Sequence, residues 1–248
     1  MKIIFLGSGT SYGIPRIGCK CKICKDARRV GSKNKRCRSS LFVNYKNYNI
    51  LIDTSPDFKN QIIDNDIKHI DVVLYTHDHA DHIFGLPDIR SFKKIKCYGQ
   101  KETIKTIKRS FNYIFNPRHI GGGIPEIELN EAKIKIVFKD FDIFPIQVLH
   151  GNTKTYGYKI GNLAYIPDVK SIPLGSLKKL KNLKLLIIDG LRYSPHQTHV
   201  NIKESLEIIN KIKPQKTFLT HISHEIDHYD IELPSNVKLA YDGLTIHL

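Results

Sequence analysis

Long apolar runs are absent from this 248-residue sequence, in which no stretch reaches the roughly 18 residues that a membrane-spanning helix requires. Residues 1–6 are basic and then apolar for only four positions before Gly7, which is too short for a secretory signal. We therefore expect a cytoplasmic protein without a membrane partner. Proline- or serine-rich linkers and internal repeats are also absent, which favours one domain over 1–248.

Cysteine is scarce and odd in number. The five cysteines include Cys19, Cys21 and Cys24, which fall within six positions. An odd count in a chain without an export signal argues against a disulfide framework. The C-x-C-x2-C spacing is instead a moderately specific indication of a metal site.

Acidic residues are few, with 24 Asp and Glu against 39 Lys and Arg, so the formal net charge is +15. Such a charge favours an acidic partner: nucleic acid, a membrane surface or a phosphorylated small molecule. The lysines are spread along the chain rather than clustered. The sequence is also rich in Lys, Ile and Asn and has no Trp, as AT-rich coding would give. A purely compositional origin of the charge therefore stays open.

Short apolar segments alternate with turns and a few helical patterns, as in a mixed α/β fold. Strands are expected over residues 3–6, 72–75, 134–138, 144–149, 156–160, 163–166, 185–188, 217–220 and 237–246, with a hairpin over 41–53. Helices are expected over 57–65, 101–111 and 202–212. Two irregular stretches interrupt this pattern, a Cys-rich basic insert at about 11–40 and a loop insert at about 112–125.

Residues 77–82, with the sequence His-Asp-His-Ala-Asp-His, form the most informative segment and are called the hexad below. The hexad follows the apolar strand 72–75, so a turn at a strand end carries three imidazoles and two carboxylates. The histidine spacings suit a tight turn leading into a helix better than one helix face. Imidazole and carboxylate are ligands of Zn, Mn and Fe, so this turn is a candidate metal site.

Further candidate ligands also come where strands end. His150, Asp168 and His221 follow the predicted strands 144–149, 163–166 and 217–220, and Asp53 closes the hairpin. Because strand ends along one edge of a sheet converge, these side chains can meet the hexad although they are distant in sequence. Each alone is weak evidence, but their combination with the hexad makes chance much less plausible.

In these features the chain resembles the metallo-β-lactamase superfamily. The resemblance rests on residues 76–82 followed by His150, Asp168 and His221, in that family's order and approximate spacing. It covers nearly the whole chain. It implies an α/β (α+β) fold, a four-layer αββα sandwich, with a dinuclear metal site at one edge.

The resemblance also implies a role for each ligand. One divalent ion, Zn or Mn, would be held by His77, His79 and His150. A second would be held by Asp81, His82 and His221. Asp168 would bridge the two ions, Asp53 would orient the hexad turn, and Asp81 would count among the catalytic residues.

A closer resemblance is to the phosphoribosyl 1,2-cyclic phosphate phosphodiesterases of bacterial phosphonate breakdown. It rests on the Cys-rich segment 18–24, the basic segment up to residue 40, and segments 195–199 and 219–224. Those enzymes carry a structural zinc besides the catalytic pair. Carried over to this chain, its ligands would be Cys19, Cys21, Cys24 and His224. Three thiolates and one imidazole make a closed tetrahedral zinc site.

The predicted reaction is hydrolysis of a cyclic phosphate or small phosphodiester, with phosphoribosyl 1,2-cyclic phosphate as one candidate. A pair of divalent ions activates water near neutral pH and offsets phosphoryl charge. The resemblance implies His199 as the general acid for the leaving oxygen, with His196 a weaker candidate. The sequence does not identify substrate-binding residues, since Arg16, Arg36 and Arg38 can either bind phosphate or be solvated.

Other functions stay open. A tRNA 3′-end processing endonuclease of the same superfamily would use the +15 charge for phosphate contacts, although the sequence has no long basic insert. A thioesterase or lactonase is less favoured, and a zinc-stabilised binding protein would not need a full set of ligands. We expect a phosphorylated small-molecule substrate, with nucleic acid as a less favoured partner. A homodimer stays open.

Overall fold

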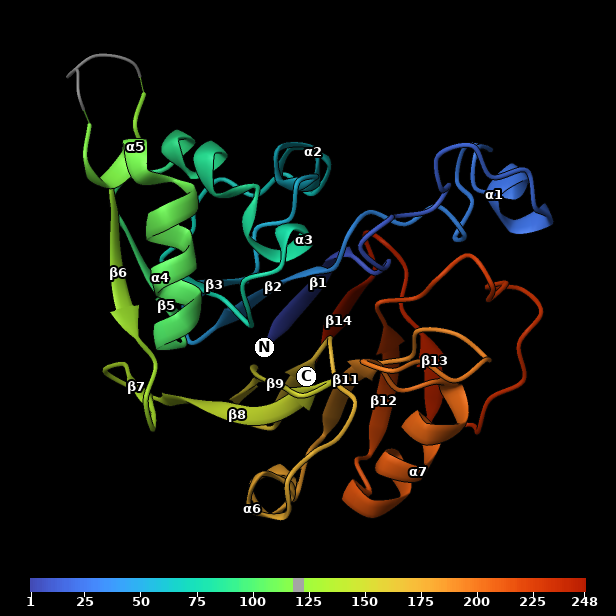
Figure 1. Ribbon diagram of the computed structural model, residues 1–248. Helices are drawn as coiled ribbons and strands as arrows, with labels where there is room; N and C mark the ends of the chain where they lie inside the picture. The colour runs from blue at the N-terminus through green and yellow to red at the C-terminus, as the bar shows by residue number, and fades with distance from the viewer. Residues whose placement is uncertain (118–122) are drawn as a thin grey trace.

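The protein is described by a computed structural model over residues 1–117 and 123–248. In this part of the chain, two seven-stranded β-sheets form the centre of the molecule (Figure 1). The first sheet has the strand order β14-β1-β2-β3-β4-β5-β6. The second has the order β13-β12-β11-β10-β9-β8-β7.

The bounds of these elements are as follows. The first sheet consists of β1 (Lys2–Gly7), β2 (Ser40–Tyr45), β3 (Tyr48–Ile52), β4 (Val72–Leu74), β5 (Ile95–Gly99), β6 (Ile127–Glu131) and β14 (Thr245–His247). The second consists of β7 (Ile136–Val137), β8 (Asp142–His150), β9 (Thr153–Ile160), β10 (Leu163–Ile166), β11 (Leu185–Asp189), β12 (Lys216–Thr220) and β13 (Val237–Leu239). The helices are α1 (Lys22–Asp26), α2 (Phe58–Asp64), α3 (Ala80–Ile83), α4 (Lys101–Ser110), α5 (Asn112–Phe115), α6 (Leu174–Leu177) and α7 (Ile202–Ile212), with 3₁₀ turns η1 (Leu86–Ser91) and η2 (Lys178–Leu180).

Both sheets carry apolar side chains on both faces, so each sheet must be covered on both sides. In β1, Ile3 and Phe5 belong to the core between the sheets, whereas Ile4 and Leu6 belong to a core shared with α2, α3 and α4. Successive residues of a strand point to opposite faces, so two-sided burial requires helices outside each sheet. The helix α7 covers the outer face of the second sheet (Figure 1). The result is the four-layer αββα sandwich that the sequence predicted.

The predicted helix 202–212 is present as α7, and its ends have local causes. The Asn201 side chain accepts a hydrogen bond from the backbone N–H of Glu204, and the Glu204 carboxylate accepts one from the Asn201 N–H. This capping box satisfies two N–H groups that would otherwise lack partners. The helix ends at Lys213, which has a left-handed conformation (φ 55°), directly before Pro214.

Some predicted elements are wrong in detail. Residues 237–246 form two strands, β13 and β14, in different sheets, because the chain turns between them at Gly243 (φ 81°). The strands β5 and β6 were not predicted, since lysine and glutamate interrupt their apolar residues. The predicted loop insert at 112–125 begins with α5, and residues 118–122 lie outside the described part of the chain.

None of the described helices combines the length and the apolar character needed to span a membrane.

Candidate metal centre

The predicted ligands meet where strands from both sheets end. The hexad follows β4 of the first sheet, whereas His150 ends β8 and Asp168 and His221 follow β10 and β12 of the second sheet. In the second sheet, β8, β10 and β12 run in the same direction, so their ends lie along one edge. The predicted ligands therefore come together, with the hexad supplied by one sheet and the later ligands by one edge of the other.

Asp53 holds the hexad turn in place through hydrogen bonds. Its buried carboxylate accepts hydrogen bonds from the backbone N–H and the hydroxyl of Thr76, both at 2.8 Å. It also accepts one from Nδ1 of His82 at 2.8 Å. A carboxylate bound to Nδ1 leaves Nε2 as the free lone pair of that imidazole. These contacts fit the orienting role that the sequence suggested for Asp53.

Asp168 lies between two groups of imidazoles. Its carboxylate oxygens lie 3.3 Å from Nε2 of His82, 3.4 Å from Nε2 of His221 and 3.8 Å from Nε2 of His77. Asp81 lies 3.2 Å from Nε2 of His82 and 3.6 Å from Nε2 of His221. Ligand atoms within 4.8 Å of one another make up overlapping groups: His77, His79 and His150; His77, His82 and Asp168; and Asp81, His82 and His221.

Several of these buried atoms lack a hydrogen-bond partner within the described residues. They are Nε2 of His77, His82 and His221 and Oδ1 of Asp168. An unpaired buried polar atom costs roughly 1–3 kcal/mol, so four that face one another need a common partner. A divalent cation satisfies imidazole and carboxylate lone pairs together. The residues therefore fit a metal site of the kind that the sequence predicted.

A second loop is anchored to the ligand His150. The carbonyl oxygen of Thr198 accepts hydrogen bonds from Nδ1 of His150 at 2.9 Å and from the N–H of Gly151 at 3.1 Å. A Cβ at Gly151 would lie 2.9 Å from the Thr198 side chain, so this close approach needs glycine. The anchor fixes the free lone pair of His150 on Nε2 and holds residue 199 beside the cluster.

Burial and neighbouring charges set the protonation states of the ligands. Burial opposes ionisation of Asp168, but His221 and His82 hold its pKa well below the usual value. Burial lowers the pKa of His77 well below its ordinary value, and it lowers that of His150 to about 4. Asp168 is therefore ionised and these two imidazoles are neutral at pH 7. Metal binding requires these states.

His199 is paired with a carboxylate that the sequence analysis did not include in the site. Its Nδ1 lies 2.7 Å from Oδ2 of Asp189, and its Nε2 lies 3.9 Å from Oδ2 of Asp168. Asp189 is fully buried at the end of β11, the strand between those that lead to Asp168 and His221. Its position directly after an apolar strand is the sequence feature from which Asp189 could have been predicted as a site residue. His199 also belongs to a fourth group, with His150 and Asp168, whose atoms are close enough to hold a metal ion.

The Cys-rich insert forms a separate cluster of four potential ligands. Nδ1 of His224 lies 3.5 Å from Sγ of Cys19 and 3.4 Å from Sγ of Cys21, and Cys24 completes the group. A tetrahedral zinc ion with ordinary Zn–S and Zn–N bonds separates sulfur from nitrogen by about 3.5 Å. The short helix α1 begins after Cys21 and carries the buried Cys24. The spacing of these atoms fits the predicted structural zinc.

Replacing Cys24 with serine should remove one zinc ion and lower the thermal midpoint by roughly 10 °C, because a closed zinc site stabilises the fold it cross-links. Elemental analysis and thermal denaturation of the same sample measure both effects. Cys37→Ser, at a cysteine outside the cluster, is the matched control and should retain the zinc. A Cys24→Ser variant with the full metal content and an unchanged midpoint would contradict the site.

The three arginines considered as phosphate ligands have other contacts. Arg36 is buried, and its guanidinium donates to Oγ of Ser8 at 2.7 Å and to the carbonyl of Ala240. Arg38 pairs with Asp57 at 2.9 Å. Arg16 stacks on the ring of Tyr12 at 4.3 Å. Arg36 therefore supports the fold and is not a solvated surface residue.

Residues 48–222 match the family model described as the β-lactamase superfamily domain. This range includes every candidate ligand around Asp168, from His77 to His221. The chain belongs to the β-lactamase superfamily. The recognition of this superfamily from the hexad and the later ligands, together with its αββα fold, is confirmed.

Solved structures extend this superfamily relationship. A crystal structure of a diphosphatase from the PhnP family is 36% identical, with a TM-score of 0.91, and the match covers 100% of this chain and 97% of that one. Zn²⁺-bound PqqB from Methylobacterium extorquens is 20% identical, with a TM-score of 0.82, and both chains are fully covered. The second likeness shows the fold alone.

Curated relatives carry different names. An octanoyltransferase from Porphyromonas gingivalis is 36% identical over 98% of this chain and 51% of its own length. A ribonuclease Z from Nanoarchaeum equitans is 30% identical over 63% of this chain and 53% of its own. The chain thus spans about half the length of these relatives. It has the metallo-β-lactamase fold and is similar in sequence to a PhnP-family diphosphatase over its whole length and to ribonuclease Z over part of it.

Proposed function

We propose that this protein is a metal-dependent phosphodiesterase that hydrolyses a cyclic phosphate or another small phosphodiester, with phosphoribosyl 1,2-cyclic phosphate as one candidate. The observation that carries the proposal is the set of unpaired Nε2 and carboxylate atoms around Asp168, with the His199–Asp189 pair beside it. The names diphosphatase and ribonuclease Z also support it, since both describe cleavage at phosphorus–oxygen bonds.

Two divalent ions, Zn or Mn, would be held by the candidate ligands around Asp168, and one structural Zn by the Cys-rich insert. The first ion would be held by His77, His79 and His150, and the second by Asp81, His82 and His221. Asp168 faces both groups and would bridge the ions. When bound, such a pair supplies Lewis-acid stabilisation of phosphoryl charge and lowers the pKa of water.

His199 would supply the proton that the leaving oxygen needs. With Nδ1 bonded to Asp189, its other nitrogen, Nε2, is free to donate toward the phosphodiester. Burial lowers the pKa of His199, and the hydrogen bond between its Nδ1 and the Asp189 carboxyl group fixes the ring. As the phosphorus–oxygen bond breaks, the proton on Nε2 passes to the departing oxygen, which in a cyclic phosphate stays attached to the product.

Asp189→Asn should lower kcat about 10- to 100-fold without changing the metal content, because the variant keeps the side-chain shape but replaces a carboxyl oxygen with an amide N–H, so Nδ1 of His199 is no longer held in one orientation. Steady-state kinetics and elemental analysis measure the two effects. Asp140→Asn, at an exposed position, is the control. An unchanged kcat would show that His199 does not depend on Asp189.

A substrate panel tests the proposal directly. The metal-loaded protein should hydrolyse a bis-aryl phosphodiester and a ribose cyclic phosphate, and it should leave a pre-tRNA, an acyl thioester and a lactone intact. Turnover of the thioester or the lactone alone would overturn the phosphodiesterase assignment in favour of acyl hydrolysis.

A tRNA 3′-end endonuclease is the second candidate. It is favoured by the ribonuclease Z relative and by the net charge of +15, which suits phosphate contacts. Cleavage of pre-tRNA without turnover of the small phosphodiesters would establish this candidate in place of the first. Its rate should also fall steeply with salt, since the release of counterions from the phosphates favours binding less at higher salt concentration.

A further inference from the structure

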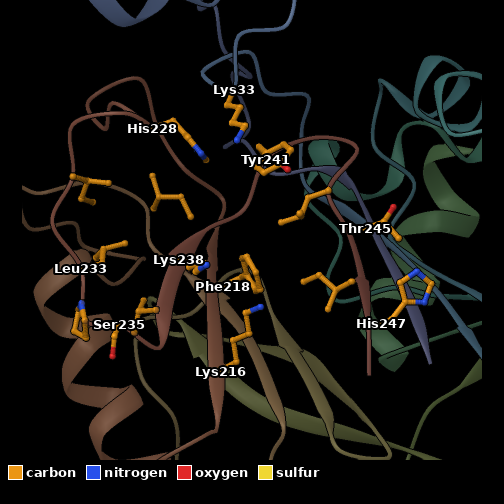
Figure 2. A pocket seen from close by; sticks show the side chains of 16 residues that line it. Lys33, Lys216, Phe218, His228, Leu233, Ser235, Lys238, Tyr241, Thr245 and His247 are labelled. Carbon is orange, nitrogen blue, oxygen red and sulfur yellow. The ribbon is translucent and has the colours of Figure 1, made fainter.

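A second cavity lies away from the metal centre. It has a volume of about 780 Å³ and is lined by residues of β12, β13, β14, the loop before β13, and Lys33 (Figure 2). The strands β13 and β14 end the two sheets on the same side of the sandwich, so the cavity lies at the open edge between the layers. It contains no member of either metal-ligand cluster.

The charged groups that line this cavity all have the same sign. Lys33, Lys216 and Lys238 contribute ammonium groups, and the lining includes no aspartate or glutamate. In the described part of the chain, none of these three lysines has a carboxylate within ion-pair distance. Two of them lie against aromatic rings instead, Lys33 at 4.5 Å from the centre of Tyr241 and Lys216 at 5.1 Å from that of Phe218.

His228 adds an uncharged hydrogen-bond donor to the lining of the cavity. Its Nδ1 lies 3.2 Å from the guanidinium of the buried Arg36, which can only donate, so Nδ1 accepts and the ring proton is on Nε2. Burial, with further contributions from Arg36 and Lys33, lowers the pKa of His228 to about 4. The ring is therefore a hydrogen-bond donor at pH 7 rather than a fourth cation.

Aliphatic side chains, among them Leu233 and Leu244, also line the cavity beside the basic groups. A volume of this size is typical of pockets that hold one small molecule. An apolar body would remove these walls from water, and an anionic head would meet unpaired cations.

We propose that this cavity binds a small amphipathic anion, namely an organic phosphate with an apolar body, at a site separate from the metal centre. The lysines and His228 hold the phosphate, and the aliphatic walls hold the body. The absence of acidic lining residues favours an anionic ligand at this site. The inference does not depend on the reaction performed at the hexad.

The probe is 2-naphthylphosphonate, whose phosphorus–carbon bond is not a phosphoester. Titration of the ¹⁵N-labelled, metal-loaded protein should shift backbone amides in residues 216–218 and 228–247 in a saturable manner. Shifts at residues 77–82 would report binding at the metal centre and are fitted separately. Inorganic phosphate and naphthalene-2-methanol should each bind the cavity more weakly. The first lacks the apolar body and the second lacks the anionic group.

Variants connect the shifts to the cavity. The double variant Lys216→Gln/Lys238→Gln should weaken binding about tenfold, because it removes two of the three cations. Lys59→Gln, at an exposed lysine on α2 outside the lining, is the charge-matched control and should leave the affinity unchanged. Thermal midpoints check that all variants are folded.

Three results would overturn the proposal: no saturable shifts in 216–218 and 228–247, equal affinity for the double variant and wild type, or equal affinity for inorganic phosphate and the probe. The last would show a simple anion site without a role for the apolar walls.

Discussion

Asp168→Ala should abolish binding of the two proposed catalytic metal ions and lower the proposed phosphodiesterase activity at least about a thousandfold. The reason is its position, with carboxylate oxygens 3.3 Å from Nε2 of His82, 3.4 Å from that of His221 and 3.8 Å from that of His77. No other described carboxylate of the cluster faces both groups of imidazoles at these distances. Elemental analysis and activity of the same preparation measure the result.

Asp78→Ala is the matched control for this variant. Asp78 belongs to the hexad, but its carboxylate accepts a hydrogen bond from Thr106 at 2.7 Å, and it is in none of the ligand groups described above. We expect this control to keep its metals and most of its activity. The structural zinc should survive in both variants, since its ligands are separate. Full metal content in Asp168→Ala would show that Asp168 is not a ligand.

His199→Ala should lower turnover about 100- to 10,000-fold while both catalytic metal ions remain bound. The effect should depend on the leaving group. An alkoxide needs a proton as it departs, so cyclic phosphate hydrolysis should show the full loss, whereas a nitrophenolate leaves without one and should show little. Parallel kinetics with the two substrates measure this difference.

The outcome also decides between two roles for His199. Its Nε2 lies 3.9 Å from Asp168 and within a group that could hold a metal ion. Loss of a metal ion in His199→Ala, with equal losses on both substrates, would make it a ligand instead of an acid. His196→Ala is the control, since His196 contacts Thr198 rather than Asp168 or Asp189. It should retain most of the activity.

The hexad and the later candidate ligands could be predicted because the ends of buried strands can be recognised in the sequence. Apolar segments such as 72–75 and 217–220 stop abruptly at a polar residue, and that residue lies at a sheet edge in any open α/β arrangement. The same periodicity gave α7 and the hairpin of β2 and β3. Elements whose local pattern was strong were therefore predicted correctly.

What the sequence could not give depends on tertiary contacts. The contribution of two sheets to one site requires the packing of β4 against the second sheet, which no local pattern encodes. Asp189 follows an apolar strand like the other candidates, but its partner His199 is ten residues away in an irregular loop. From the sequence Arg36 can either bind phosphate or be solvated, because a basic segment carries no sign of the burial that the structure shows.

The most direct test of the account is reconstitution of the metal-free protein. Chelated protein is titrated with Zn²⁺ or Mn²⁺ while bound metal and hydrolysis of a ribose cyclic phosphate are followed together. The account predicts about three ions per chain, one of them zinc that resists mild chelation, with activity appearing only as the other two bind. Full occupancy of the ligand clusters without hydrolysis of any phosphodiester would contradict it.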